Sequence, residues 1–410
     1  MNDPVTYGVQ LYGKRIGSLY CHDNTSSFLF DAEYLEDESR DVLGLGFEQD
    51  LGARFTSNVR LPVWFSNLLP EGVLRDWVAE ERGVSRTREP ELLAQVGGDL
   101  PGAVEVRPSY PQADIPLTRS VHAASPTERD QIGWKFSLAG VGLKFSMLKE
   151  TDRFTCPASG AGGDWIIKLP DRIYRGVPLN EYAMMHLASR IGIDVPEIKL
   201  VHRDDVTGLP NSVWPESEEF AFAVRRFDRK ESREKIHIED LAQVRGFYPE
   251  DKYRGNLETV ANLCFRGFDT RALIEFTKRL TLNILIGNGD AHLKNWSLIY
   301  RDRRKPTISP AYDIVSTGLY VPRGDKHDLG LTFGGSRRFE DMRLNTFRKL
   351  AQRLNADVDL ADIAEDTVSK ALTEWPGAAN LLDAAPDVRT EVEHFLEQRS
   401  ITLRRGVAAR

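Results

Sequence analysis

An aspartate and an asparagine stand five residues apart in the polar stretch 286–297, between an apolar helix-like run and an apolar strand-like run. Polar residues between two segments of buried type are a common setting for a site on a rigid scaffold. The spacing of Asp290 and Asn295, D-x-x-x-x-N, suits a proton-accepting carboxylate and a metal-binding amide in phosphoryl transfer. Asp313 follows where a hairpin would return the chain to the same place. The sequence predicts a phosphoryl-transfer centre with Asp290 as base and Asn295 and Asp313 as magnesium ligands.

A lysine and a glycine-containing turn upstream can serve the same chemistry. Lys168 lies in the apolar, strand-like run 165–169, and the turn 139–144 lies between two apolar segments. Backbone N–H groups in such a turn can cradle phosphates, and a strand lysine can neutralise them. Simpler interpretations stay open, because the lysine could reach solvent and the three polar residues could make turn hydrogen bonds. No second His or Cys lies at ligand spacing from His292, which favours a loop-ordering or phosphate-contacting role over zinc binding.

Composition narrows the class of protein. The 410 residues are 41% hydrophobic, enough for more than one domain, and the net charge of −7 argues against general nucleic-acid binding. The three cysteines are far apart, which argues against a disulfide framework and suits a reducing compartment. The first residues lack the features of a signal peptide, and no apolar run has the length of a membrane span. We therefore expect a cytoplasmic protein without membrane segments.

Hydrophobic periodicity predicts an α+β chain. A hairpin at 7–20, a strand at 28–30 and helices at 73–83 and 92–96 form a small N-terminal part, and the proline-rich residues 107–127 mark a boundary. Strands are expected at 145–148, 165–169, 195–200 and 220–224, with a helix at 180–191. Helices are expected near 239–246, 255–267, 271–287, 340–355, 360–373 and 385–403. This order predicts a two-lobed protein-kinase-like fold with an N-terminal subdomain (1–125), a kinase N-lobe (126–230) and a helical C-lobe (231–410).

Several motifs, in one order along nearly the whole chain, resemble the HipA-type serine/threonine kinase toxins of bacterial toxin–antitoxin modules. NLLPEG at 67–72 and GGDLPGA at 97–103 resemble that family's N-terminal signatures, and SLAG at 137–140 resembles its glycine-rich loop. GDAHLKN at 289–295 resembles the catalytic loop, and YD at 312–313 the metal-binding segment. The other matching segments are IIKLP at 166–170, NEY at 180–182, VRRFDR at 224–229 and ED at 239–240.

The resemblance implies an active ATP- and Mg²⁺-dependent kinase in which Asp290 accepts the proton and Asn295 and Asp313 hold the metal. It implies that phosphorylation of Ser137, which adds about two negative charges, would expel the glycine-rich loop and inactivate the enzyme. The implied ATP-binding residues are Ala139, Gly140, Val141, Gly142, Leu143, Lys144, Lys168, Arg225, Arg226, Phe227, His292, Leu293, Lys294, Asn295, Tyr312, Asp313, Ile314 and Val315.

The implied partners are a small helix-turn-helix antitoxin resembling HipB and a protein substrate. The resemblance points to an aminoacyl-tRNA synthetase, especially the glutamyl enzyme, as that substrate. No helix-turn-helix is evident in this chain, so contact with DNA is expected mainly through the antitoxin.

Two departures from the family pattern leave alternatives open. Gly142 and Leu143 stand where the family has Gln-Glu, and Arg225 stands where it has glutamate, which leaves adenine recognition to the backbone and Phe227. One alternative is a small-molecule kinase, against which the N-terminal signatures speak. The other is an inactive, kinase-like co-repressor acting with a DNA-binding antitoxin, which the two departures would favour.

Overall fold

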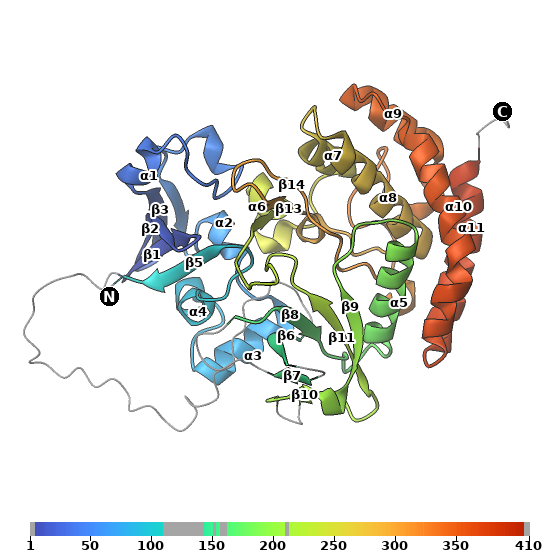
Figure 1. The fold of residues 1–410 in the computed structure, drawn as a ribbon, viewed down its shortest axis with the longest axis horizontal. Helices are drawn as coiled ribbons and strands as arrows, with labels where there is room; N and C mark the ends of the chain where they lie inside the picture. Colours follow the sequence, from blue (N-terminus) through green and yellow to red (C-terminus); the bar gives the residue numbers. More distant parts are fainter. Residues whose placement is uncertain are drawn as a thin grey trace, which may run out of the picture. The chain divides into compact units, whose positions relative to one another are not determined.

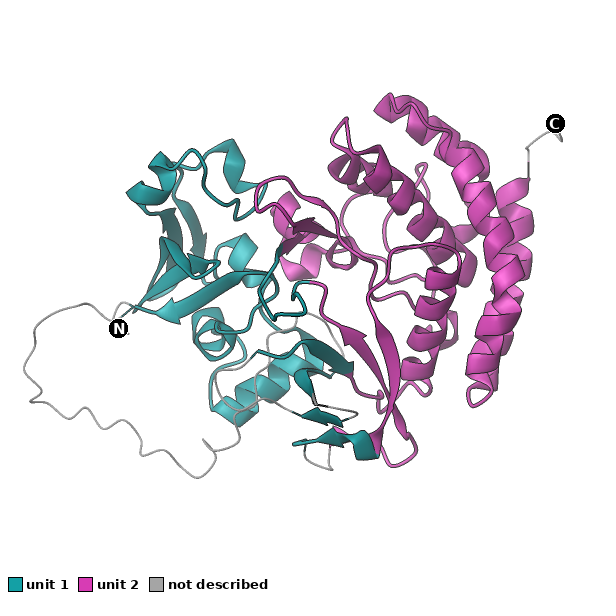
Figure 2. Ribbon diagram, viewed as in Figure 1, with its two compact units in different colours: residues 1–167, 204–209, 228–237 teal, residues 168–203, 210–227, 238–410 magenta. Residues whose placement is uncertain are grey.

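The computed structural model describes residues 5–109, 143–150, 153–155, 162–209, 213–322 and 324–405. Figure 1 labels the helices and strands, and Figure 2 shows the chain divided into two units. Unit 1 comprises residues 1–167, 204–209 and 228–237, and unit 2 comprises residues 168–203, 210–227 and 238–410. Among the described residues, no helix combines the length and the apolar character that a membrane crossing needs.

Unit 1 contains a five-stranded antiparallel sheet in the order β4-β3-β2-β1-β5. Every second residue of β1 is buried, as expected for a strand with one face on a core. The β1–β2 turn has positive φ at Tyr12 (52°) and Gly13 (78°), the conformation of a two-residue turn that matches strand twist. The strand bounds are β1 Val5–Leu11, β2 Lys14–His22, β3 Thr25–Phe30, β4 Phe55–Asn58 and β5 Val104–Pro108.

Aromatic side chains and four short helices complete this part of unit 1. Phe28 packs its ring against Phe47 and Phe65, with centroids 5.7 and 4.9 Å away. The helices are α1 Ala32–Glu36, α2 Val63–Ser66, α3 Gly72–Arg82 and α4 Glu89–Val96. The rest of unit 1 holds β6 Lys144–Glu150, β7 Arg153–Thr155 and β10 Val206–Thr207, with β7 antiparallel to β6 and parallel to β10. Strand β8, Trp165–Lys168, ends with the first residue of unit 2.

A buried polar network joins the 97–103 signature to residues 228–237 within unit 1. The Arg229 guanidinium donates to Asp99 Oδ1 at 2.9 Å, to Asp228 Oδ2 at 2.8 Å and to the Gly102 carbonyl at 3.0 Å. The Gly102 N–H in turn donates to Asp228 Oδ2 at 2.8 Å. The Arg229 side chain is only 4% exposed, so these partners replace the hydration that the charge loses on burial.

His237 extends this network and is held neutral. Its Nδ1 accepts from the Ala103 N–H at 3.3 Å, so the ring proton lies on Nε2, which donates to the Leu43 carbonyl at 2.7 Å. Burial lowers the pKa of His237 from 6.5 to about 4, against smaller opposing effects from the Leu43 carbonyl and Asp228. A second proton would sit on Nδ1 and would point at another donor, so the network selects the uncharged ring.

Unit 2 begins with Lys168 and continues into a helix and two strands. Helix α5, Val177–Arg190, packs on β9, Ile198–His202, and β11, Phe220–Arg225, which pair antiparallel. A small sheet in the order β12-β13-β14 follows, built from His237–Asp240, Ser297–Tyr300 and Thr307–Ile308, with His237 itself belonging to unit 1. The β13–β14 pair is an antiparallel hairpin, as the sequence predicts.

The remainder of unit 2 is mostly helical. Its helices are α6 Leu241–Arg245, α7 Leu257–Phe265, α8 Thr270–Ile286, α9 Leu344–Leu354, α10 Leu360–Ala379 and α11 Pro386–Arg404. α8 begins at Asp269, whose carboxylate accepts from the Ala272 N–H at 2.9 Å, and ends at Gly287 in the left-handed conformation. α10 packs against α5, α8 and α9, and α11 packs against α8 (Figure 1).

The predicted α+β class with a helical C-terminal region is confirmed, and most predicted elements lie within a few residues of the observed ones. One boundary is wrong: residues 239 and 240, expected in a helix, end β12 instead. Asp240 is the N-cap of α6, where its carboxylate and the Gln243 side chain form a capping box that starts the helix at Leu241. The boundaries expected between three domains stay a prediction.

Candidate active site

Lys168 lies at the end of β8, with its ammonium between two carboxylates. Nζ lies 2.5 Å from Glu181 Oε1, on α5, and also donates to Asp313 Oδ1. Burial alone would lower the pKa of Lys168, but the charges of Asp313 and Glu181 outweigh it and hold the pKa above its ordinary value. The lysine is therefore a fixed positive charge, and two of its three hydrogens are engaged.

Asp313 occupies an unusual backbone conformation that neighbouring groups hold in place. Its φ is +55°, in the left-handed region that residues other than glycine rarely adopt. Ser316 lies three residues after Asp313, and the buried Asn180 of α5 binds both of its backbone groups. Asn180 donates to the Ser316 carbonyl at 2.8 Å and accepts from the Ser316 N–H at 3.1 Å. Consecutive residues of α5, Asn180 and Glu181, thus fix the segment 313–316 and the lysine.

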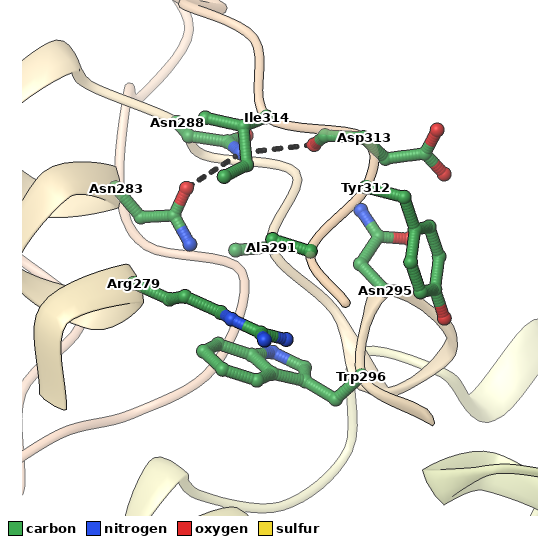
Figure 3. Close-up of a pocket in the computed structure, with 10 residues that line it drawn as sticks. Arg279, Asn283, Asn288, Ala291, Asn295, Trp296, Tyr312, Asp313 and Ile314 are labelled. Atoms are coloured by element: carbon green, nitrogen blue, oxygen red, sulfur yellow. Dashed lines mark hydrogen bonds between the residues drawn. The ribbon is translucent and has the colours of Figure 1, made fainter. Parts of the chain in front are cut away.

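The loop after α8 is tied to the same segment by Asn288. Its side-chain amide donates to Asn283 Oδ1 at 3.0 Å and to the Asp313 backbone carbonyl at 3.3 Å, as Figure 3 shows. Asn288 is 1% exposed, so its two hydrogen bonds connect α8 to Asp313 out of contact with solvent. The loop bearing Asp290 and Asn295 is consequently positioned relative to Asp313.

Asp290 and Asn295 are fixed to each other through the loop backbone. The Asp290 N–H donates to Asn288 Oδ1 at 3.1 Å, and the Asp290 carbonyl accepts from the His292 N–H at 2.8 Å. Asn295 Nδ2 also donates to the Asp290 carbonyl, at 2.9 Å, which commits the NH₂ end of this amide and leaves its oxygen as the end that can bind a cation. The Asp290 carboxylate is 51% exposed and can meet a second molecule.

A pocket opens where these segments converge within unit 2. Asn295 and Asp313 line one part of it together with Tyr312, while Asn288 and Ala291 form another part (Figure 3). The remaining lining residues are Arg279, Asn283, Trp296, Ala311 and Ile314. Four predicted site residues, Asn295, Tyr312, Asp313 and Ile314, therefore line one pocket.

The end of α8 that presents the loop is capped by basic groups. The Arg399 guanidinium, from α11, donates to the Ile284 carbonyl at 3.0 Å and lies 3.9 Å from the ring centroids of both Phe339 and Phe395. His327 Nε2 donates to the Gly287 carbonyl at 2.8 Å. Burial lowers the pKa of Arg399 to about 10, still well above neutral pH. Donors at a helix C-terminus satisfy its free carbonyls and oppose the negative end of its dipole.

The other residues predicted for the site in 292–295 and 312–315 are mostly buried or half-buried. Lys294 is 5% exposed, and its Nζ lies 3.5 Å from Asp240 Oδ2. The Tyr312 hydroxyl donates to the Lys294 carbonyl at 2.8 Å, and burial raises the pKa of Tyr312. His292 and Leu293 are buried, and Val315 is half-buried. Among the described residues, no group of three His, Cys, Asp or Glu side chains is arranged to hold a metal ion.

The predicted hinge residues lie at the end of β11 and just after it. Arg225 binds Glu197 through its backbone N–H, at 2.8 Å to the carbonyl, and its guanidinium lies 3.7 Å from the carboxylate. Arg226 is 2% exposed, and the Phe227 ring lies 5.6 Å from that of Tyr312. Leu143 and Lys144 are half-buried in unit 1. Ser137, Ala139, Gly140, Val141 and Gly142 lie outside the described residues.

Comparison with known proteins identifies the family. A model described as the HipA-like C-terminal domain matches residues 136–375, and one described as the HipA N-terminal domain matches residues 7–107. The chain belongs to the HipA family. The resemblance inferred from the sequence motifs is thereby confirmed.

Relatives within the HipA family carry kinase names. The chain is 41% identical over 396 residues to the protein named "Putative kinase Y4dM" of Sinorhizobium fredii, covering 94% of this chain and 95% of that one. It is 26% identical over 328 residues to the serine/threonine-protein kinase toxin HipA of Shewanella oneidensis, covering 71% of each chain. A solved structure of HipA from Shewanella oneidensis MR-1, in complex with HipB and operator DNA, superposes with a TM-score of 0.69 at 21% identity. That match covers 97% of this chain and 96% of the other, so the fold is the HipA kinase fold.

Three residues of the site were given no role from the sequence: Glu181 and Asn288, which lie in the noted segments 180–182 and 286–297, and Tyr253. Glu181 had a readable signal, because a glutamate on the helix after a strand lysine is the usual ion-pair partner in kinases. Asn288 acts through contacts to backbone that no spacing rule describes. The Tyr253 hydroxyl donates to Asp290 Oδ1, from a turn 37 residues upstream.

Proposed function

We propose that this protein is a magnesium- and ATP-dependent serine/threonine protein kinase that acts in the cytoplasm as the toxin of a toxin–antitoxin module. The observation that carries the proposal is the Lys168 ammonium held between Glu181 and Asp313. The Asp313 backbone is tied by Asn288 to the loop that bears the proposed base, Asp290. A cation-and-carboxylate arrangement of this kind positions and neutralises phosphate groups, which is the main task of a phosphoryl-transfer enzyme.

The donor set of unit 2 fits magnesium with ATP. Asn295 offers an amide oxygen and Asp313 a carboxylate whose side chain is 30% exposed. These are hard oxygen ligands, and magnesium usually takes one or two protein ligands and completes its shell with phosphate and water. Lys168 retains one hydrogen for a phosphate oxygen, since two of three are engaged by carboxylates. The part that residues 139–142 and the hinge 225–227 play in binding ATP stays a prediction.

The mechanism assigns one task to each side chain. Bound ATP with magnesium supplies the transferable phosphoryl group and the cation that neutralises its charge. Asp290 orients the acceptor hydroxyl and takes its proton, because its carboxylate is exposed while its backbone is fixed on both sides. Lys168 would stabilise negative charge at the phosphates, Glu181 holds its ammonium in place, and Asn295 and Asp313 would hold the magnesium ion.

The substrate and the regulation extend this proposal. We propose glutamyl-tRNA synthetase as the protein acceptor and phosphorylation of Ser137 as self-inactivation, as in the family that the motifs resemble. The HipA relative in the solved complex binds HipB and operator DNA, which supports a small HipB-like antitoxin as partner and indirect DNA contact.

Intact mass spectrometry of the dephosphorylated protein with Mg-ATP and glutamyl-tRNA synthetase tests the proposal. The wild type should add phosphate to itself and to the synthetase, and Asp290→Ala should abolish both. Ser137→Ala should abolish only the self-modification. Asp302→Ala, which changes an exposed aspartate in the β13–β14 turn, is the matched control and should behave as wild type. ATP binding without transfer by the wild type would contradict the kinase assignment and favour a co-repressor.

A further inference from the structure

A tyrosine that the mechanism above leaves unused contacts the proposed base. Tyr253 lies in the turn that follows the 3-10 helix Pro249–Asp251, and its hydroxyl donates to Asp290 Oδ1. The two residues are 37 positions apart in the chain but belong to the same unit. The contact joins a neutral donor to a carboxylate, which is a stronger type of hydrogen bond than one between neutral groups.

The turn that carries Tyr253 is attached to the catalytic loop at several points. The Leu293 N–H donates to the Lys252 carbonyl at 3.0 Å, so the two segments are joined through their backbones. The Tyr253 ring meets His292 edge-on, with centroids 5.1 Å apart and planes at 80°. The Arg337 guanidinium donates to the Tyr253 carbonyl at 2.6 Å. These contacts limit the positions that the phenol can take and aim it at Asp290.

The Asp290 carboxylate has two oxygens, and Tyr253 engages one of them. Among the residues that the structure describes, Oδ2 has no hydrogen-bond partner, while His292 Nε2 lies 4.0 Å away on the Oδ1 side. Asn288 and Asn295 fix the Asp290 backbone but leave rotation about its side-chain bonds free. The hydroxyl of Tyr253 is therefore the group that selects the rotation of the carboxylate.

We propose that Tyr253 is a positioning residue for Asp290, holding Oδ1 so that Oδ2 faces the acceptor hydroxyl. This inference rests on the proposed kinase function. The Tyr253 side chain belongs to a residue that is 38% exposed, so its hydrogen bond contributes little to folding. Its effect should appear in the transfer step, because proton acceptance requires the base within hydrogen-bond reach of the acceptor.

Phosphate transfer to glutamyl-tRNA synthetase by the full chain tests the role of Tyr253. Tyr253→Phe removes the hydroxyl and keeps the ring, and kcat should fall about tenfold, the effect expected for one hydrogen bond to a charged group. The KM for ATP and the melting temperature should stay as in wild type. Tyr20→Phe is the matched control, because it removes the hydroxyl of an exposed tyrosine on β2, and its kcat should not change.

A double variant separates positioning from an independent role. If Tyr253 acts through Asp290, Tyr253→Phe should have no further effect on the residual rate of Asp290→Ala. A wild-type kcat in Tyr253→Phe, or independent effects in the double variant, would overturn the inference while leaving the kinase function intact. No transfer by the wild type itself would overturn the proposed function and this inference with it.

Discussion

Lowering the pH from 7 to 4 is expected to weaken unit 1 through His237, which is fully buried and neutral in the folded chain. Above pH 6.5 the ring is neutral in the folded and in the unfolded chain, so it adds no pH dependence there. Between pH 6.5 and about 4 the unfolded chain binds a proton that the folded chain does not, and the free energy of unfolding falls as the pH falls. Below about pH 4 both states are protonated and the loss stops.

The size of the effect follows from the two pKa values. Each pH unit in this window is worth about 1.4 kcal/mol, so a pKa lowered from 6.5 to about 4 corresponds to a total loss of roughly 3 kcal/mol. The cause is structural, since a charged ring would lose hydration and would turn Nδ1 from an acceptor into a donor facing the Ala103 N–H.

Urea unfolding at half-unit steps from pH 7.5 to pH 4, followed by tryptophan fluorescence, measures this loss. Carboxylates titrate in the same range, so the informative quantity is the difference between the wild type and His237→Gln. Glutamine can still donate to the Leu43 carbonyl and accept from Ala103, but it does not titrate. The difference should change by about 3 kcal/mol across the window. His394→Gln, which removes an exposed ring, is the matched control, and parallel curves for wild type and His237→Gln would refute the reasoning.

Two further substitutions test the positioning of the site. Glu181→Gln removes one of the two charges that hold Lys168, so the ammonium should shift toward Asp313 and phosphate transfer should fall about tenfold or more, with unchanged transfer counting against the ion-pair role. Gly287→Ala should lower the melting temperature, and the free energy of unfolding should fall by clearly more than the roughly 1–2 kcal/mol that the left-handed conformation costs a residue with a side chain. The reason is that the added Cβ would lie 2.4 Å from a guanidinium nitrogen of the buried Arg399. Gly335→Ala has the same type of φ with open space around it, so equal losses for the two variants in thermal and urea unfolding would contradict the clash.

The core of the site was predictable because its signals are local. The apolar spacing that ends at Gly287 predicts α8, and the loop after it carries Asp290 and Asn295 at a fixed offset. Lys168 was predictable as a strand lysine, and the structure brings it to Asp313. These residues lie in or next to regular elements, where periodicity fixes the direction of the chain.

The supporting residues were not predictable, because their roles depend on tertiary contacts. Tyr253 lies in an irregular turn, and nothing in its neighbours indicates that it contacts the loop that carries Asp290. Asn180 was noted as part of a motif, but its hydrogen bonds to both backbone groups of Ser316 are visible only in the structure. The start of α6 was readable in principle, since Asp240 and Gln243 have the spacing of a capping box.

The Arg399 cap has a consequence for protein synthesis. Arg399 lies six residues before the last described position, on a helix beyond the region that matches the family model. A ribosome has made every proposed catalytic residue long before it makes α11, and until then the end of α8 lacks the donor that binds the Ile284 carbonyl. The loop after α8 therefore gains this support only after α11 has been synthesised. A nascent chain without α11 would hold the loop of Asp290 and Asn295 on a helix end that lacks the Arg399 donor.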